Sequence, residues 1–481
     1  MKLLTWLIAI IVLVGCAGHK GTDYQNAKLH MLYIDGDGNL IDPNQKTIIG
    51  ERGDLKKTKA AEKMYLERIF QNYIALRNKD KKLRITLFIH GGLNNFSTAV
   101  DRPGRMVDDM LADHQYPIFI AWNSDFWPNY ADHLFRIRKG LNRPVLGAMT
   151  SPVVLIEDLG RSLVRVPSSM YKEISDPVAV SKSVNSVDEA DYQRRVDKLD
   201  DMGFQVSNSP PHVGVGSDYY TVWNPVKLGM APLVDGFGTG AWDGMLRRTD
   251  LVLTKNIAFE GDLITEPDKE FKGPVRYADT AVTALLHRLE KKGDQQGSPY
   301  PVDGSEINIV GHSMGAIVAV NILARHPDIN VNNLVFMGAA ARVKEVENVV
   351  VPWLVTRPEV DFWNLSLDPY REIGENFFHD FMPRGSLLNW IDYTFGEVNS
   401  FKDRTAGSWW NMTRLAEDVF PNAQVVDDVA CYRPLRNRVH LTRFPIDNHG
   451  KWPQKHGEFA DYKFWRESYW MAESAVKLDR P

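Results

Sequence analysis

The sequence predicts an α/β fold in which a mainly parallel sheet is flanked by helices. Short apolar runs at 83–89, 118–122 and 307–310 are rich in β-branched residues, as expected of buried strands. Segments with helical spacing of apolar side chains alternate with these runs along the chain. The composition, with 44% hydrophobic and 25% charged residues, is that of a globular protein.

The N-terminal segment has the composition of a signal peptide. Lys2 supplies a positive charge, and residues 3–14 form an apolar run that is shorter than the roughly 20 residues of a membrane-spanning helix. The run leads into Leu13-Val14-Gly15-Cys16, which resembles the lipobox of bacterial lipoproteins. The resemblance implies removal of residues 1–15 and acylation of Cys16, whereas the alternative is an ordinary signal peptide with an incidental cysteine.

Acylation of Cys16 would anchor the protein durably in a membrane, because several acyl chains hold where one is marginal. Residues 16–29 would then form a polar tether. The alanine after the cysteine resembles the outer-membrane sorting pattern of Gram-negative bacteria, which implies the cell envelope, at either the periplasmic or the surface face. Cys431 would have no partner for an intrachain disulfide.

Beyond the tether, residues 29–34 alternate as a strand and end in the turn Asp35-Gly36-Asp37-Gly38, a strong hairpin signal. The turn begins like a calcium-binding loop, but Leu40 stands where that loop needs glycine and Lys46 where it needs glutamate. The sequence therefore predicts a hairpin without calcium. Helical spacing over 56–79 predicts the first long helix.

From there strands and helices alternate, as in a parallel sheet with helical crossovers. A long interruption separates the strand at 118–122 from the next recognisable element. The later elements expected, in chain order, are a helix at 277–292, a strand at 307–310, a helix at 316–325, strands at 333–337, 360–367 and 438–444, and a closing amphipathic helix at 464–477.

The pentapeptide Gly311-His312-Ser313-Met314-Gly315 fits the pattern G-x-S-x-G. It directly follows an apolar strand and opens a helix, which is the context of a nucleophile elbow. Side chains at the two glycine positions would collide with the neighbouring strand and helix, and the helix N-terminus favours developing negative charge. Ser313 is therefore the predicted nucleophile.

A second signature, His90-Gly91-Gly92-Leu93, ends a predicted buried strand. Acyl transfer requires backbone N–H donors for the oxyanion. We expect one donor from Met314, after the nucleophile, and the other from Gly92 or Leu93. His90 is expected to order this loop by hydrogen bonding rather than to exchange protons. The alternative is a simple strand-ending turn.

The acid of a catalytic triad should follow a later strand. Asp368 comes directly after the strand predicted at 360–367 and is the first choice, whereas Asp361 lies at the wrong end of that strand. Glu372 and Asp380 are fallback candidates, and a surface-turn aspartate is the alternative interpretation of Asp368.

The base should be a histidine beyond the last strand. His456 is preferred, in Lys455-His456-Gly457-Glu458-Phe459, and His449 is the alternative; the other of the two would be a solvated loop histidine. His440 falls inside the predicted strand and does not suit the role.

The chain resembles the α/β-hydrolase superfamily, in its lipase and carboxylesterase branch. The resemblance is carried by the His-Gly-Gly loop, Ser313, Asp368 and His456, which follow one another along the chain in the order used by that superfamily. The resemblance implies an α/β-hydrolase fold with a large cap or lid insertion. It divides the chain into a catalytic domain at 30–125 and 276–481, a cap at 126–275 and a second insertion at 369–437. It also implies ester hydrolysis through an acyl-serine, with no metal or organic cofactor.

The cap interleaves apolar and basic residues at 135–139 and 163–166, so it is either a lid resting on an anionic membrane or a helical cap packed on the core. The second insertion carries three tryptophans that would form an acyl-binding wall or aromatic core: Trp390, Trp409 and Trp410.

The expected partner is an acyl-ester or lipid substrate. The formal net charge of −4 gives no basic field for nucleic acid. An acyltransferase would use the same catalytic groups, and a binding lipoprotein that keeps the fold without catalysis is the alternative from another class.

Overall fold

The computed structural model describes residues 24–51, 54–138, 141–186, 197, 205–206, 225–256, 277–290, 307–329, 331–375, 385–415, 435, 437–447 and 449–478. The predictions on the signal peptide, the acylated Cys16, Cys431 and Asp380 lie outside these residues.

The centre of the molecule is a nine-stranded sheet with the order β2-β1-β4-β3-β10-β11-β12-β13-β7. Eight strands are parallel and only the edge strand β2 is antiparallel to its neighbour, which confirms the predicted α/β class. The strands are β1 (Met31–Ile34), β2 (Leu40–Ile41), β3 (Arg84–Ile89), β4 (Gln115–Trp122), β7 (Gln205–Val206), β10 (Ile307–His312), β11 (Asn333–Met337), β12 (Asp361–Ser366) and β13 (Val439–Arg443).

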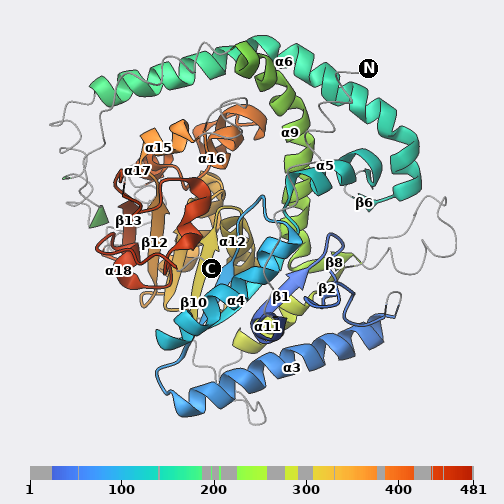
Figure 1. The fold of residues 1–481 in the computed structure, drawn as a ribbon, viewed down its shortest axis with the longest axis vertical. Coiled ribbons are helices and arrows are strands. Elements are labelled where there is room, and N and C mark those ends of the chain that lie inside the picture. Colours follow the sequence, from blue (N-terminus) through green and yellow to red (C-terminus); the bar gives the residue numbers. More distant parts are fainter. Residues whose placement is uncertain are drawn as a thin grey trace.

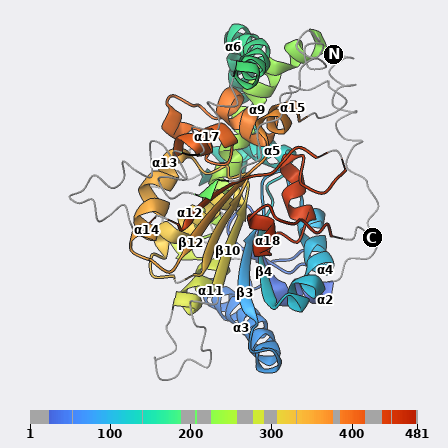
Figure 2. The ribbon, with the colours of Figure 1, turned by 90° about the vertical axis from the view of Figure 1, so that its left-hand side faces the viewer.

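Helices cover both faces of the sheet, because successive side chains of a strand point to opposite faces (Figure 2). In β3, Leu87 packs into the larger apolar core and Phe88 into the smaller one. The larger core lies under α3 (Leu55–Lys79), α11 (Ala281–Glu290), α12 (Gly315–Arg325) and α14 (Val351–Val355), and the smaller under α2 (Tyr24–His30), α4 (Phe96–Ala112) and α18 (Glu467–Trp470).

Residues 24–29 of the tether predicted at 16–29 belong instead to the folded domain, where they form most of α2; residues 16–23 lie outside the described residues. Ala27 is fully buried, and the ring of the buried His30 donates from Nδ1 to the Pro117 carbonyl at 2.9 Å. Burial lowers the pKa of His30 to about 4, so the ring is neutral. The strand predicted at 29–34 accordingly begins only at Met31.

Two further predicted helices were wrong in part. Residues 277–292 begin with β9 (Tyr277–Asp279), which pairs with β8 (Thr254–Asn256), before α11 starts. The closing helix is only the four residues of α18, because Phe464 and Trp465 are both buried in a non-helical segment and the chain turns at Ala472 with φ +55°. Buried aromatic residues at helical spacing do not require a helix.

Shorter elements connect these strands and helices along the chain. They are β5 (Ile137–Arg138), β6 (Leu141–Asn142), α13 (Val343–Glu345), α15 (Pro369–Gly374), α16 (Leu387–Trp390), α17 (Trp409–Arg414), two π-helical turns at Val346–Val350 and Ile391–Phe395, and two 3-10 turns at Phe401–Asp403 and His456–Asp461. Of the three tryptophans predicted to form an acyl-binding wall or aromatic core, Trp409 is buried in the larger core and Trp390 packs against that core. The structure does not describe the side chain of Trp410.

The first insertion contributes α5 (Phe126–Phe135), α6 (Pro144–Ser186) and α9 (Pro225–Leu251). Trp242 and Met245 of α9 belong to the larger core, and β7 joins the edge of the main sheet, so these two parts of the insertion are packed on the core. Figure 1 shows α6 as the outermost helix, at the end of the molecule opposite α3.

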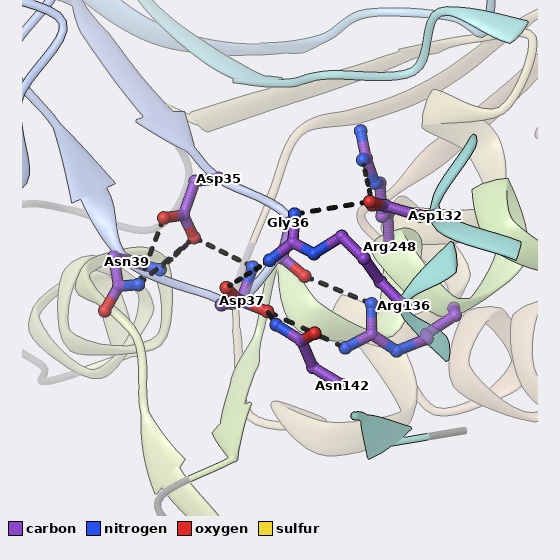
Figure 3. Close-up of polar contacts among 9 residues, drawn as sticks. Asp35, Gly36, Asp37, Asn39, Asp132, Arg136, Asn142 and Arg248 are labelled. Carbon is purple, nitrogen blue, oxygen red and sulfur yellow. Dashed lines mark hydrogen bonds and ion pairs between the residues drawn. The ribbon is translucent and has the colours of Figure 1, made fainter. Parts of the chain in front are cut away.

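The predicted hairpin is confirmed, since β1 pairs antiparallel with β2. The Asp35 carboxylate accepts the backbone N–H groups of Asp37 and Asn39 at 2.9 and 2.8 Å, which closes the turn. Asp37 accepts the side-chain amide of Asn142 at 3.1 Å (Figure 3). Arg247 of α9 donates to the Gly36 carbonyl at 3.1 Å, so polar contacts from the insertion reach this turn. Within the insertion, Arg248 of α9 pairs with Asp132 of α5 at 2.6 Å.

Candidate active site

The predicted elbow has the backbone geometry of a tight strand–turn–helix. Ser313 lies between the end of β10 and the start of α12, with φ +53°, a region that non-glycine residues rarely occupy. A Cβ at Gly311 would lie 2.9 Å from the Ala316 backbone, and one at Gly315 would collide with the Ile89 carbonyl. Both glycines are therefore required by close backbone approach.

Ser313 and His456 are brought together, although 143 positions separate them. The Ser313 Oγ lies 2.7 Å from Nε2 of His456, and both residues are buried. Burial, with a smaller contribution from His312, lowers the pKa of His456 to about 3, so the imidazole is neutral. The alternative base His449 is exposed, and its backbone N–H donates to the Asp447 carboxylate.

The backbone of His456 is held on both sides. Its N–H donates to Oε2 of Glu375 at 2.9 Å, and its carbonyl accepts from Nε2 of His312 at 2.9 Å. Gly338, with φ +52°, lies directly against the ring, where a Cβ would be 2.9 Å from Cε1. None of these three roles was predicted from the sequence; only His312 has a local signal there, as the variable position before the serine.

No hydrogen bond joins the predicted acid to the predicted base. Among the described residues, Nδ1 of His456 has no hydrogen-bond partner. Asp368 is buried beyond the end of β12, as predicted, but its Oδ2 lies 3.8 Å from Nε of Arg443, which is fully buried on β13. The structure thus places Asp368 beside this arginine.

Two further buried acids follow Asp368 along the chain. Burial raises the pKa of Glu372 to about 8, and Glu375, Asp392 and Asp368 add to the shift, while the hydroxyl of Ser386 donates to its Oε1 at 2.9 Å. Burial likewise raises the pKa of Glu375 to about 7. At pH values below these pKa values each glutamate side chain is mostly protonated, so the two buried carboxyl groups are then largely uncharged.

The loop after β3 has one carbonyl with three donors. The Gly91 oxygen accepts from Nδ1 of His90 at 2.5 Å, from Nδ2 of Asn94 at 2.9 Å and from Oγ of Ser124 at 3.1 Å. Because the N–H of Gly92 is opposite this carbonyl in the same trans peptide, the three donors fix its direction.

Of the two predicted loop donors, Leu93 is already engaged, since its N–H donates to the Ser124 carbonyl at 2.9 Å. The N–H groups of Gly92 and Met314 have no acceptor among the described residues. Gly92 also packs on the side chain of Met314, where a Cβ would be 2.7 Å from the sulfur. The two free amides therefore lie on adjoining residues beside Ser313.

His90 orders this loop, in agreement with its predicted role. Its Nε2 accepts the backbone N–H of Trp122 at 2.8 Å, so Nδ1 carries the proton given to Gly91. The ring stacks on Trp122, and burial lowers the pKa of His90 to about 3. A histidine used in this way is held neutral and does not exchange protons.

One group in the described part of the chain has metal-ligand chemistry: His287, Glu290 and His326, whose ligand atoms lie within 4.8 Å of one another. Each histidine Nδ1 is 3.1 Å from a Glu290 oxygen, so hydrogen bonds explain the cluster. It lies at the far end of α12 from Ser313 and does not belong to the candidate active site.

No known protein family, curated protein or solved structure matches this chain. The function is therefore inferred from the chemistry of the Ser313–His456 pair and of the loop beside it.

Proposed function

We propose that the protein is a serine hydrolase of the α/β-hydrolase kind, which cleaves carboxylic esters through an acyl-serine intermediate. The observation that carries the proposal is the 2.7 Å contact between Ser313 Oγ and Nε2 of a neutral, buried His456, on a strained strand–helix turn. A nucleophile and a base within hydrogen-bond distance are the central requirement of this chemistry.

In the proposed reaction, His456 takes the hydroxyl proton as Ser313 Oγ attacks the ester carbonyl. The oxyanion accepts hydrogen bonds from the amides of Met314 and Gly92. The tetrahedral intermediate collapses as His456 gives the proton to the leaving alcohol. Water, activated by the same histidine, then releases the acid. Every step uses groups of the chain itself.

Asp368 remains the proposed acid, because it follows β12 at the edge of the sheet where the elbow lies. To act as the acid, the Asp368 carboxylate must form a hydrogen bond with Nδ1 of His456. Binding of the substrate would bring the residues after β12 into this contact. The contact of Glu375 with the His456 backbone makes that residue a competitor that the sequence did not indicate. A carboxylate at Nδ1 would raise the low pKa of the histidine.

The test is hydrolysis of p-nitrophenyl esters of increasing acyl length by residues 17–481, compared with Ser313→Ala. Loss of the nucleophile should reduce kcat by about 10⁴-fold or more. A fluorophosphonate probe should label the wild-type serine and not the variant. Absence of both hydrolysis and labelling would reject the hydrolase proposal in favour of a binding protein.

The acid is assigned by comparing Asp368→Asn with Glu375→Gln and Glu372→Gln. The true partner of Nδ1 fixes the tautomer, so its amide variant should lose about 10⁴-fold in kcat with little change in KM. A residue that only positions the His456 backbone should cost far less. An unchanged kcat in Asp368→Asn would reject Asp368.

A further inference from the structure

We propose that α6 is a membrane-docking surface, with its outward face against the lipid bilayer. Between residues 145 and 171, where the side chains of the helix are described, large apolar side chains point outward. Six of them are 66–81% exposed: Met149, Val153, Ile156, Leu163, Val164 and Tyr171. Contiguous exposed apolar surface of this kind marks an interaction site in proteins that otherwise bury such residues.

The inward face of α6 is polar, which is the reverse of an ordinary surface helix. Asp158 is buried and accepts the hydroxyl of Tyr130 at 2.9 Å. The buried Asp235 of α9 accepts from Arg165 at 2.7 Å and from Ser169 at 2.8 Å. The helix is therefore held to its neighbours by charge and hydrogen bonds, and its apolar residues are left for another environment.

The packing of α9 gives a second, independent observation. Gly236, Gly240 and Gly244 follow at intervals of four residues, and each lies against α5 or α6. A Cβ at Gly236 would be 2.6 Å from the Asp158 carbonyl, and one at Gly240 would be 2.6 Å from the His133 ring. Small residues at the contact, with polar groups between helices, are how helices associate where apolar side chains face lipid.

The bilayer is the occupant that these observations favour. The apolar stripe runs from Val145 to Tyr171, about 40 Å at 1.5 Å per residue, and lies along one helix rather than forming a groove. No helix among the described residues has the length and apolar character to cross a bilayer, so α6 would lie in the interface.

Docking through α6 would also set the orientation of the candidate active site. Figures 1 and 2 place α6 at the end of the molecule opposite α3, and α3 leads directly into β3. The carboxyl ends of the strands, where Ser313 lies, thus face the side that carries α6. Conditional on the proposed hydrolase function, the substrate class is an ester of a membrane lipid.

The experiment is cosedimentation with vesicles of phosphatidylethanolamine and phosphatidylglycerol. Residues 17–481 are used, because a signal peptide or an acyl anchor would bind lipid by itself; this chain keeps every described residue. The test variant combines Met149→Ser, Ile156→Ser, Leu163→Ser and Val164→Ser. The control, Met64→Ser with Val476→Ser, removes exposed apolar side chains outside the insertion.

We expect the wild-type and control chains to bind, and the α6 variant to bind at least tenfold more weakly. A wild-type chain that does not sediment with vesicles, or an α6 variant that binds equally well, would overturn the proposal. A third outcome would also overturn it. If sedimentation velocity showed a wild-type dimer that the α6 substitutions dissociate, with vesicle binding unchanged, the α6 surface would be an interface between two copies of the chain.

Urea denaturation reports whether the α6 variant is folded, independently of any activity. Hydrolysis of a soluble p-nitrophenyl ester then tests the candidate active site separately, since these four residues lie outside it. Ser313→Ala should bind vesicles like the wild type. Vesicle binding without ester hydrolysis would support the docking surface and reject the proposed hydrolase, and hydrolysis without binding would do the opposite.

Discussion

The sheet and the helix α6 bury opposite kinds of side chain. In the sheet, Ile309, Leu87 and Leu334 are fully buried in an apolar core. In α6, Asp158 and Ser169 are buried while Ile156 is exposed. The reversed burial pattern of α6 fits its proposed role as a surface that docks on a membrane.

The strongest test of the comparison is to add one methyl group in each region. In Gly315→Ala the new Cβ would collide with the Ile89 carbonyl, and a backbone atom cannot move aside cheaply. We expect a loss of about 4 kcal/mol or more in the free energy of unfolding, measured by urea denaturation, together with loss of ester hydrolysis.

Gly160→Ala is the matched variant in α6, where a Cβ would meet nothing within 4 Å. Alanine is the better helix former, so this variant should be more stable by about 0.5–1 kcal/mol. Equal effects of the two substitutions would show that the regions are not packed differently.

The second prediction concerns the buried acids of the core. Folding raises the pKa of Glu372 from its ordinary value of 4.5 to about 8, so the native state keeps a proton that the unfolded chain releases in this window. The wild type should therefore lose stability as the pH rises from about 4.5 to 8. Glu372→Gln lacks this loss and should be more stable at pH 9, by on the order of 3 kcal/mol.

Thermal unfolding of both chains from pH 4 to pH 9 measures this effect. The two melting temperatures should differ little at pH 4 and diverge as the pH rises. Parallel curves would mean that Glu372 ionises in the native state as readily as in the unfolded one.

A smaller effect is expected at the contact between α6 and α9. In Gly236→Ala the Cβ would collide with Ser162 and the Asp158 carbonyl, so the two helices must separate slightly. We expect a loss of about 1–3 kcal/mol, seen as faster amide hydrogen exchange in α6. Gly229→Ala, also on α9, has nothing within 4 Å and should leave exchange in α6 unchanged.

The smallest effect should come from the apolar face itself. Ile156→Ser on α6 should change the free energy of unfolding in water by less than about 0.5 kcal/mol, since the side chain is exposed. Ile69→Ser on α3 removes a fully buried side chain and should cost about 3 kcal/mol. Urea denaturation of both variants tests this, and a large loss in Ile156→Ser would place that residue in a packed core.

The sheet was predictable because buried parallel strands are nearly continuous apolar runs. The strand expected at 333–337 is β11 as found, and the helix at 56–79 differs from α3 by one residue. The closing segment was not predictable, because burial of Trp465 and Tyr469 depends on distant contacts: the indole of Trp465 donates to Asp113 across 352 positions. Apolar residues in this segment recur at helical spacing, although only the four residues of α18 form a helix.

In the candidate site, too, some residues could be predicted from the sequence and others could not. Ser313 has a local signature in the five residues around it, whereas the chain order restricted the base to His449 or His456, and the structure brings His456 to the serine. Glu375 and Gly338 have none, because their roles exist only through contacts with the His456 backbone and ring. The choice between Gly92 and Leu93 likewise needed the Ser124 carbonyl, which no spacing reveals.

The parallel pairing of β10 with β3 also has a consequence for how the molecule folds. Ile307 pairs with Ile85, so the whole first insertion lies in the loop that this pairing closes. Closing so long a loop is entropically costly and slow, which favours local helical contacts of the insertion forming first. His456 comes later still in the chain. During synthesis the serine would therefore exist without its base, and the reactive pair would form only as the final segment docks.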